Sequence, residues 1–257
     1  MARKIAVSNQ KGGVGKTTTS IMMAQELIRK RKKVLLVDCD PQQNATAFYH
    51  AETEGVGTLA DILFGDEAAS ECIQKTEYGE IIANDPQVKD AENKVPVDEM
   101  RFLHLRESLK SVEDLYDYII VDTPTGLGVV MRNILASVDE IIIAAKEDGW
   151  SMSGLTDYYN VLQMVRKTTN PNIRIAGILI VMSKKTTNKA KRFRQSAETI
   201  AEQMGTIVYD TSIRECIKCC EALTEYRVPL HEYAPKCTTE EDYVAFLKEY
   251  MKKSGRR

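Results

Sequence analysis

The feature that most constrains this chain is a glycine-rich loop between a short apolar run and a helical pattern. The run Lys4–Ser8 has the character of a buried strand, and residues 17–31 carry apolar side chains at helical spacing. Between them stands the sequence KGGVGKTT, residues 11–18. Glycines let backbone amides turn toward phosphate oxygens, and the positive end of the following helix strengthens the attraction. This order predicts a phosphate-binding loop.

The loop also carries the side chains that phosphate chemistry needs. Lys16 can neutralise the β- and γ-phosphates, and the hydroxyl of Thr17 can ligate Mg²⁺. The usual pattern G-x-x-x-x-G-K-[ST] asks for glycine at position 10, where this chain has Gln10, and a second lysine, Lys11, precedes the glycines. The predicted nucleotide-binding residues are Lys11, Gly12, Gly13, Val14, Gly15, Lys16, Thr17 and Thr18.

Short β-branched runs alternate with helical patterns along the chain. This alternation predicts an α/β fold, a doubly wound and mostly parallel sheet with helices on both faces and its site at the carboxyl ends of the strands. No linker rich in Pro, Gly or Ser interrupts it, so residues 1–257 are expected to form a single domain. Strands are expected at 4–8, 34–38, 118–122, 140–145, 174–182 and 206–209, with 80–83 a weaker candidate, and helices at 17–31, 58–64, 98–112, 128–137, 153–168, 187–204, 212–225 and 239–252.

Composition excludes several other classes of protein. The chain has 257 residues, of which 43% are hydrophobic and 28% charged, so it is neither disordered nor fibrous. The net charge of −2 excludes a uniformly basic nucleic-acid coat but leaves a local basic patch open. The most apolar stretch, Ile175–Met182, is far shorter than the roughly 20 residues of a spanning helix. Because the start resembles no signal peptide, we expect a cytoplasmic protein without stable membrane insertion.

The loop variant K-G-G-x-G-K-T is a deviant Walker A box, and through it the chain resembles the ParA/MinD family of P-loop ATPases. Leu36–Thr46 (LVDCDPQQNAT) is similar to the family's second motif, and Tyr116–Pro124 to its Walker B strand. The similarity extends over residues 3–253, with looser matches at 170–177 and at Glu221-Ala222 together with Val228-Pro229. It favours the partition (ParA) branch in its short form, which lacks an amino-terminal helix-turn-helix domain.

The resemblance implies an ATPase that uses ATP and Mg²⁺. Lys16 would act on the bound phosphates, whereas Lys11 would reach across a dimer interface to the partner's nucleotide. Asp40 would orient or activate the attacking water, and the alternative for it is a structural turn aspartate ahead of Pro41. The resemblance therefore implies Lys11, Lys16 and Asp40 as catalytic residues. It implies Thr17 and Asp122 as metal-binding residues, with Asp38 in the surroundings of the metal ion.

Three departures from the family pattern stand close to these motifs. Gln43 occupies a position where the family usually has glycine, and Thr125-Gly126 replaces the usual Pro-Ser after Pro124. The segment 147–152 also differs from the family's usual sequence. None of these changes removes a charged catalytic group, but the first two could alter hydrolysis or the choice of partner.

A basic segment, residues 184–194, holds six Lys or Arg residues and no acid. Arg214 and Lys218 are four apart in the expected helix 212–225, so they would share a face. The family resemblance implies nonspecific DNA binding by these two regions, and the alternative is an ordinary solvated helix face. The predicted DNA contacts are Lys184, Lys185, Lys189, Arg192, Arg194, Arg214 and Lys218.

The implied function is DNA segregation by an ATP-dependent homodimer. This dimer would bind nonspecific DNA, lie on the nucleoid, and be stimulated by a ParB-type centromere-binding partner. A MinD-like membrane ATPase is the alternative; it would need the carboxyl-terminal helix around 242–257 to enter lipid, although docking on the protein body is favoured. An iron–sulfur ATPase using Cys216, Cys219 and Cys220 is a third class, but the spacing does not fit, and buried thiols are favoured.

Overall fold

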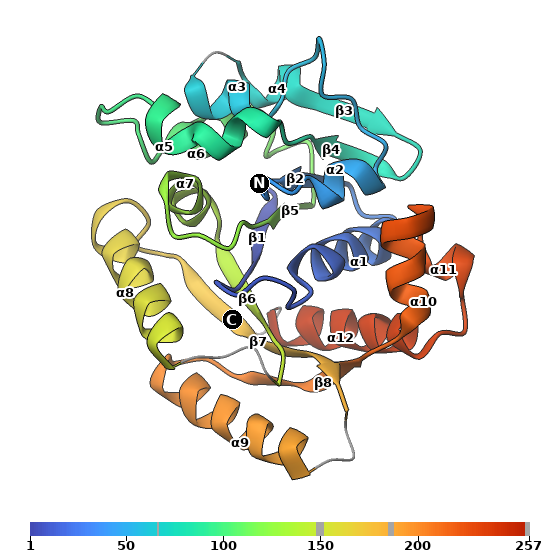
Figure 1. Cartoon of the computed structure of the whole chain (residues 1–257). Helices are drawn as coiled ribbons and strands as arrows, with labels where there is room; N and C mark the ends of the chain where they lie inside the picture. Colours follow the sequence, from blue (N-terminus) through green and yellow to red (C-terminus); the bar gives the residue numbers. More distant parts are fainter. Residues whose placement is uncertain (66, 148–151, 185–187, 255–257) are drawn as a thin grey trace.

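The computed structural model describes residues 1–65, 67–147, 152–184 and 188–254. Within these ranges eight strands form one sheet in the order β3-β4-β2-β5-β1-β6-β7-β8 (Figure 1). β3 and β4 pair antiparallel, and the other neighbouring strands in these ranges pair parallel. The bounds are β1 Arg3–Ser8, β2 Val34–Asp38, β3 Ile73–Thr76, β4 Gly79–Ile82, β5 Tyr118–Asp122, β6 Glu140–Ala145, β7 Arg174–Ser183 and β8 Val208–Arg214.

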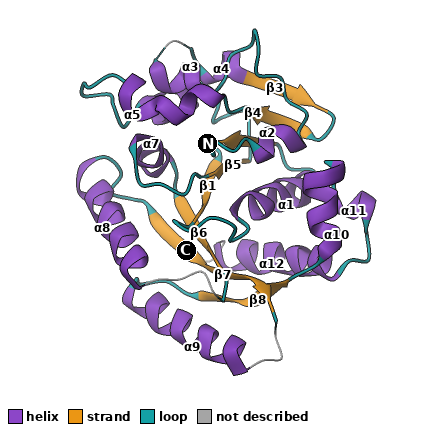
Figure 2. Cartoon of the chain, viewed as in Figure 1, coloured by secondary structure: helices purple, strands orange, loops and turns teal. Residues whose placement is uncertain are grey.

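Helices cover both faces of the sheet (Figure 2), which confirms the predicted doubly wound α/β class. In the part of the chain that the structure describes, two short non-α segments accompany them, the 3₁₀ helix η1 (Pro86–Asp90) and the π-helix η2 (Glu221–Tyr226). The helices are α1 Lys16–Arg29, α2 Asn44–Phe48, α3 Leu59–Phe64, α4 Ala69–Cys72, α5 Ala91–Lys94, α6 His104–Leu109, α7 Val129–Ser137, α8 Met152–Thr168, α9 Asn188–Gln203, α10 Ile217–Cys220, α11 Leu230–Tyr233 and α12 Thr238–Ser254.

The core divides into two clusters because successive strand residues point to opposite faces of the sheet. In β1, Ile5 and Val7 join one cluster and Ala6 joins the other. The first cluster packs under α1, α2, α11 and α12, and the second under α3, α6, α7, α8 and α9. Buried on both faces, the central strands are nearly continuous runs of Val, Ile and Leu, which is why the sequence reveals them.

Strand register places the carboxyl ends of β1, β2 and β5 side by side. Val7 of β1 and Asp38 of β2 both lie opposite Asp122 of β5. The loops that leave these three strands therefore meet at one edge of the sheet, where an open α/β sheet binds its ligands. This edge is called the phosphate edge below.

Most expected elements are confirmed, and two need correction. The helix expected over 98–112 is reduced to α6, because Asp98 accepts a hydrogen bond from the backbone N–H of Met100 (2.8 Å) in a turn. The helix expected over 212–225 is wrong in its first part. There the chain continues as β8, since Ser212 and Arg214 pair with β7, and helical structure begins at Ile217.

Candidate nucleotide-binding site

The phosphate loop leaves β1 and turns directly into α1. Gly13 and Gly15 have φ values of +69° and +73°, the left-handed region that favours glycine. The loop is fixed further by Asn9, whose side-chain oxygen accepts from the N–H of Lys11 (3.0 Å) and whose amide donates to the carbonyl of Ala144 (2.6 Å). The loop amides therefore surround a space at the amino end of α1, as a phosphate cradle requires.

A pocket of about 420 Å³ opens at this loop. It contains most of the predicted nucleotide-binding residues together with Asp40 of the loop after β2. It also contains residues that sequence motifs do not mark, such as Leu223 and Thr224 of η2. Its lining comprises Gly12, Gly13, Gly15, Lys16, Thr17, Thr18, Ile21, Asp40, Pro41, Gln42, Asn44, Pro124, Thr125, Met182, Leu223 and Thr224.

Lys16 is a buried cation in the lining of the pocket. Its side chain is 5% exposed, and its Nζ donates to the carbonyl of Lys11 at 3.5 Å. Burial lowers the pKa of Lys16, while the nearby carboxylates of Asp122 and Asp40 act in the opposite direction. A cation with so little solvent interacts strongly with any anion that enters the pocket.

Asp122 ends β5 as a fully buried carboxyl group. Its Oδ1 accepts from Ser20 Oγ at 3.1 Å, and Oδ2 has no hydrogen-bond partner among the described residues. Burial raises the pKa of Asp122 to about 8, with Asp38 contributing, whereas hydrogen bonds from Thr17 and Ser20 oppose the rise. An unpartnered carboxylate oxygen beside a threonine hydroxyl matches the oxygen donors that Mg²⁺ prefers, so these residues fit such an ion.

Asp38 ends β2 and holds the loop that follows it. Its Oδ2 accepts from the backbone N–H and the hydroxyl of Thr46 at 2.7 and 2.8 Å, and its Oδ1 accepts from the N–H of Asp40 at 3.1 Å. Burial raises its pKa to about 6 against these hydrogen bonds. Sequence reasoning missed Thr46 as its partner. The described contacts of Asp38 hold the loop in position. A role for Asp38 in the surroundings of a metal ion therefore stays a prediction.

Asp40 lines the pocket and is half-buried. Its Oδ1 accepts from the N–H of Gln42 at 3.0 Å, and its carbonyl accepts from the N–H of Gln43 at 2.8 Å. This tight turn passes through Gln43 at φ +56°. The left-handed conformation there explains why glycine suits the position, and why Gln43 is strained. Thr125, the second departure, lies 3.8 Å from where a Cβ on Gly12 would stand.

Comparison with known proteins agrees with this geometry. Residues 2–175 match the family model described as an AAA domain. The chromosome partitioning protein ParA of Myxococcus xanthus is 31% identical over 256 residues, covering 98% of this chain and 89% of that protein. The sporulation initiation inhibitor protein Soj of Bacillus subtilis is 34% identical over 252 residues, covering 97% and 98%. The chain belongs to the ParA/MinD family of P-loop ATPases.

The fold of this ParA-like chain is also that of a solved structure. Cobyrinic acid a,c-diamide synthase from Mycobacterium smegmatis, crystallised with ADP and magnesium, superposes with a TM-score of 0.84 at 24% identity, covering 100% of this chain and 97% of that one. This likeness confirms the predicted fold over the whole length of the chain.

The predicted DNA contacts are placed unevenly in the ParA-like fold. Lys184 follows β7, and Lys189 and Arg192 are exposed on α9. Lys185 lies outside the described residues. Arg194 is turned back onto the protein, where its guanidinium donates to the carbonyl of Tyr209 at 3.1 Å and to Ser212 Oγ at 2.8 Å.

Arg214 and Lys218 do not share a helical face, which corrects the prediction for this pair. Arg214 ends β8, whereas Lys218 is exposed on α10. The guanidinium of Arg214 makes two parallel hydrogen bonds of 2.8 Å to the carboxylate of Asp242 on α12, and Glu241 lies 3.6 Å away. These bonds raise its pKa. The charge of Arg214 is therefore neutralised within the protein.

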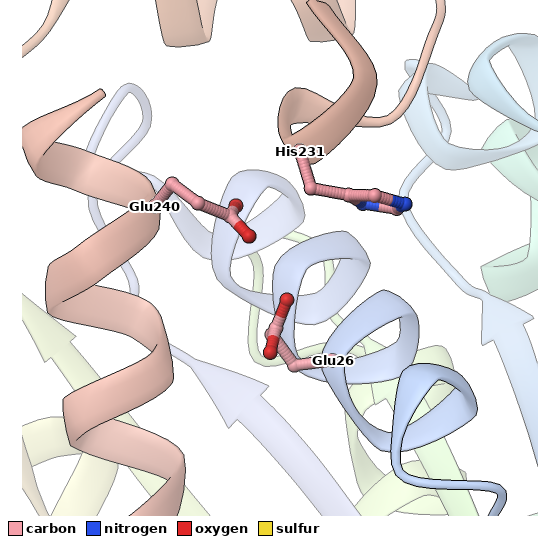
Figure 3. A group of neighbouring side chains, drawn as sticks. All are labelled: Glu26, His231 and Glu240. Carbon is pink, nitrogen blue, oxygen red and sulfur yellow. The ribbon is translucent and has the colours of Figure 1, made fainter. Parts of the chain in front are cut away.

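A second polar cluster lies away from the pocket, between α1, α11 and α12 (Figure 3). The ligand atoms of Glu26, His231 and Glu240 all lie within 4.8 Å of one another. Arg29 contacts both carboxylates, so a cation of the chain itself already compensates them. Burial and the neighbouring Glu26 raise the pKa of Glu240 to about 7, against Arg29. This cluster joins α1 to α12.

Proposed function

We propose that this chain is a DNA-segregation ATPase whose ATP-bound dimer binds nonspecific DNA. The observation that carries the proposal is the phosphate edge, where Lys16 and Asp40 line one pocket at the glycine loop and the carboxyl group of Asp122 lies close enough to Lys16 to raise its pKa. The relatives named as ParA and Soj, similar over nearly the whole chain, support the partition role.

The pocket suits a magnesium-bound adenosine nucleotide. The loop amides and Lys16 would hold the phosphates, and Thr17 with Asp122 would hold the metal through a hydroxyl and a buried carboxylate. When bound, Mg²⁺ would neutralise phosphate charge and orient the terminal phosphate. The M. smegmatis structure of the same fold carries ADP and magnesium. Adenine over guanine rests on the family resemblance.

Hydrolysis would depend on two further residues of this chain. Asp40, in the lining of the pocket, would accept a hydrogen bond from the attacking water and hold it in line with the terminal phosphate. Lys11 is exposed at the start of the loop. From there it would reach the nucleotide of a partner subunit, where a positive charge stabilises the charge that spreads over the phosphate oxygens in the transition state. Dimerisation and ATP would thus be coupled.

DNA would be held by exposed lysines and arginine around α9 and α10. We assign this basic surface to the exposed residues Lys184, Lys189, Arg192 and Lys218. We leave out Arg194 and Arg214, which are partly buried. Contacts of this kind release counterions from phosphates and read no sequence. Such a dimer would sit on the nucleoid in the cytoplasm until a ParB-type partner stimulates hydrolysis.

The membrane alternative is less well supported by the carboxyl-terminal helix. Phe246, Leu247 and Tyr250 of α12 are fully buried against the sheet, so its apolar face is already covered. None of the helices in the described ranges has the length and apolar composition needed to cross a bilayer. Co-sedimentation with liposomes, with and without ATP, separates this alternative from DNA binding.

The deciding experiment measures duplex DNA binding with ATP, with ADP and without nucleotide, in the hydrolysis-blocked variant Asp40→Ala. Tight binding with ATP alone is expected, independent of DNA sequence. If each subunit makes 2–3 phosphate contacts, the slope of log K against log salt is roughly −4 to −5 for the dimer and about −2 for a monomer. Binding that ignores nucleotide, or that selects a sequence, contradicts the proposal.

A second measurement isolates the role of Lys11. Lys11→Ala should bind nucleotide, because Lys16 and the loop amides remain, but it should stay monomeric with ATP. Light scattering of Lys11→Ala and of the parent, both carrying Asp40→Ala, compares their masses. Equal masses with ATP would show that Lys11 does not couple the subunits.

A further inference from the structure

Two cysteines that the ATPase site does not use lie in contact at the ends of one segment. Cys216 follows β8 and Cys237 precedes α12, and the thiol of Cys237 donates to the sulfur of Cys216 at 2.9 Å. Both are free thiols. Sequence spacing groups Cys216 with Cys219 and Cys220 and gives no sign of Cys237, because folding alone brings it back.

The surroundings of Cys216 favour its thiolate. Burial by itself would raise its pKa, but hydrogen bonds from the Cys237 thiol, from the amides of Cys219 and Lys218 and from the Thr239 hydroxyl lower the pKa below its ordinary value. Cys216 is also partly exposed, whereas Cys237 is 7% exposed. A partly exposed thiolate beside a second thiol is the arrangement of an oxidisable pair.

The other cysteines do not combine these properties. Cys39 and Cys72 are fully buried, and burial raises the pKa of each thiol. Burial likewise raises the pKa of Cys219 to about 12. Cys220 is exposed, with a sulfur 3.6 Å from the hydroxyl of Thr224. Exposure alone would therefore favour Cys220 as the reactive thiol, whereas the contact between sulfurs favours Cys216.

We propose that Cys216 and Cys237 form a modification site, a dithiol that hydrogen peroxide oxidises to an intrachain disulfide. The Cys216 thiolate attacks one peroxide oxygen, the O–O bond breaks, hydroxide leaves and Cys216 becomes a sulfenic acid. The sulfur of Cys237 then attacks the sulfenic sulfur, the S–O bond breaks, and the oxygen leaves as water with the proton of Cys237. Peroxide is thereby reduced, and the two thiols lose their two hydrogen atoms.

The disulfide would close a loop over residues 216–237. This segment contains α10, η2 and α11, and it supplies Leu223 and Thr224 to the nucleotide pocket. Because the two sulfurs already touch in the reduced protein, oxidation needs little rearrangement and should leave the pocket formed. Its effect is to restrain the unfolded chain. Reversible disulfides of this kind occur in redox-responsive proteins of reducing compartments.

The experiment treats the full chain with one equivalent of hydrogen peroxide, alkylates the remaining thiols and maps the peptides. Reactive thiols should fall from the six that the chain contains to four, with a Cys216–Cys237 linked peptide that a reductant reverses. The oxidised protein should also unfold at a higher guanidinium concentration than the reduced one. Cys220→Ser is the matched control and should behave as the parent does.

Two variants test which cysteine takes part in each step of the oxidation. Cys237→Ser should accumulate a sulfenic acid at Cys216, which dimedone traps, and Cys216→Ser should lose the linked peptide. Oxidation at Cys216 should be at least about tenfold faster than at Cys220, following its thiolate character. A peptide linked through Cys219 or Cys220, a disulfide between chains, or equal slow loss of all thiols would overturn the proposal. None of these outcomes depends on nucleotide or DNA binding.

Discussion

Sequence motifs identify charged residues both at the phosphate edge and on the basic surface, but the burial and the partners of these residues differ in the fold. At the phosphate edge, Lys16 and Asp122 are buried, and Asp122 keeps an oxygen without a partner among the described residues. Across the predicted DNA contacts, Arg194 and Arg214 are bound by other parts of the chain, while Lys189 and Arg192 are exposed. A buried polar atom left without a hydrogen-bond partner indicates a missing ligand, whereas an exposed charge does so much less.

The difference arises from what fixes each residue in space. The backbone fixes the phosphate edge, because parallel register sets Asp38 and Asp122 opposite each other and glycine turns set the loop. A run of basic residues carries no such constraint. Whether Arg214 faces DNA or a carboxylate depends on Asp242, which is 28 residues away in sequence. Removing single charges in each region tests this comparison.

The largest effect is expected at the phosphate edge. Lys16→Ala should weaken binding of a fluorescent ATP analogue about 100-fold or more, because a buried cation that pairs with phosphates is lost. Asp40→Ala should keep affinity within about threefold and slow phosphate release by roughly 100-fold or more, because this residue acts on water. Equal loss of ATP affinity in both variants would contradict the proposed roles, in which Lys16 binds the phosphates and Asp40 acts on water.

The next effect concerns two residues of the basic surface. Exchanging both Lys189 and Arg192 for Glu should reduce ATP-dependent DNA affinity at least about tenfold and flatten its salt dependence, since each lost contact lowers the slope. ATPase activity without DNA should stay near that of the parent, because neither residue lines the pocket. Fluorescence anisotropy at several salt concentrations checks the affinity. Unchanged DNA binding would mean that these two residues belong to an ordinary solvated helix face.

Arg214 supplies the matched contrast within the same set of predicted contacts. Arg214→Gln should lower the free energy of unfolding by roughly 1–3 kcal/mol, because Asp242 loses charge-assisted hydrogen bonds. DNA affinity should change less than threefold. Guanidinium unfolding and the same anisotropy assay give both quantities. A large loss of DNA affinity with unchanged stability would show that Arg214 belongs to the surface after all.

The sequence could predict those features of the fold and the site that local patterns determine. The strands 34–38 and 118–122 and the roles of the glycine loop follow from local patterns, because both faces of those strands are buried and a phosphate cradle has a fixed backbone. Local patterns could not distinguish β8 from a helix, since pairing with β7 extends that strand to Arg214. Three pairings form only in the folded protein, and no short sequence motif indicates them: Thr46 with Asp38, Asp242 with Arg214, and Cys237 with Cys216.

A smaller effect on stability is expected at Glu240, a buried carboxylate whose charge Arg29 compensates. In the folded protein the pKa of Glu240 is about 7, above its ordinary value of 4.5, so this group binds its proton more tightly folded than unfolded. Its contribution to stability is therefore greatest below about pH 4.5 and is lost as the pH rises to about 7. Glu240→Gln should remove this loss, so the variant should gain on the order of 1 kcal/mol relative to the parent between pH 5 and pH 8.

Urea unfolding at each pH measures this gain. The exposed Glu225→Gln is the control and should follow the parent at all pH values. A variant curve for Glu240→Gln that runs parallel to the parent's would mean that Arg29 alone compensates the two glutamates.

The smallest effect concerns strain beside the site. Gln43 holds a φ of +56°, which costs a side-chain-bearing residue on the order of 1 kcal/mol, and glycine does not incur this cost. Gln43→Gly should therefore raise the free energy of unfolding, although the greater freedom of glycine in the unfolded chain offsets part of the gain and leaves roughly 0.5 kcal/mol. Gln43→Ala keeps the strain and loses the 3.4 Å hydrogen bond to the carbonyl of Asn84, so it should gain nothing. Equal stability of the two variants, measured in guanidinium, would mean that the left-handed turn stores no strain and that glycine is favoured at this position for another reason, such as the approach of a second subunit to Asp40 in the proposed dimer.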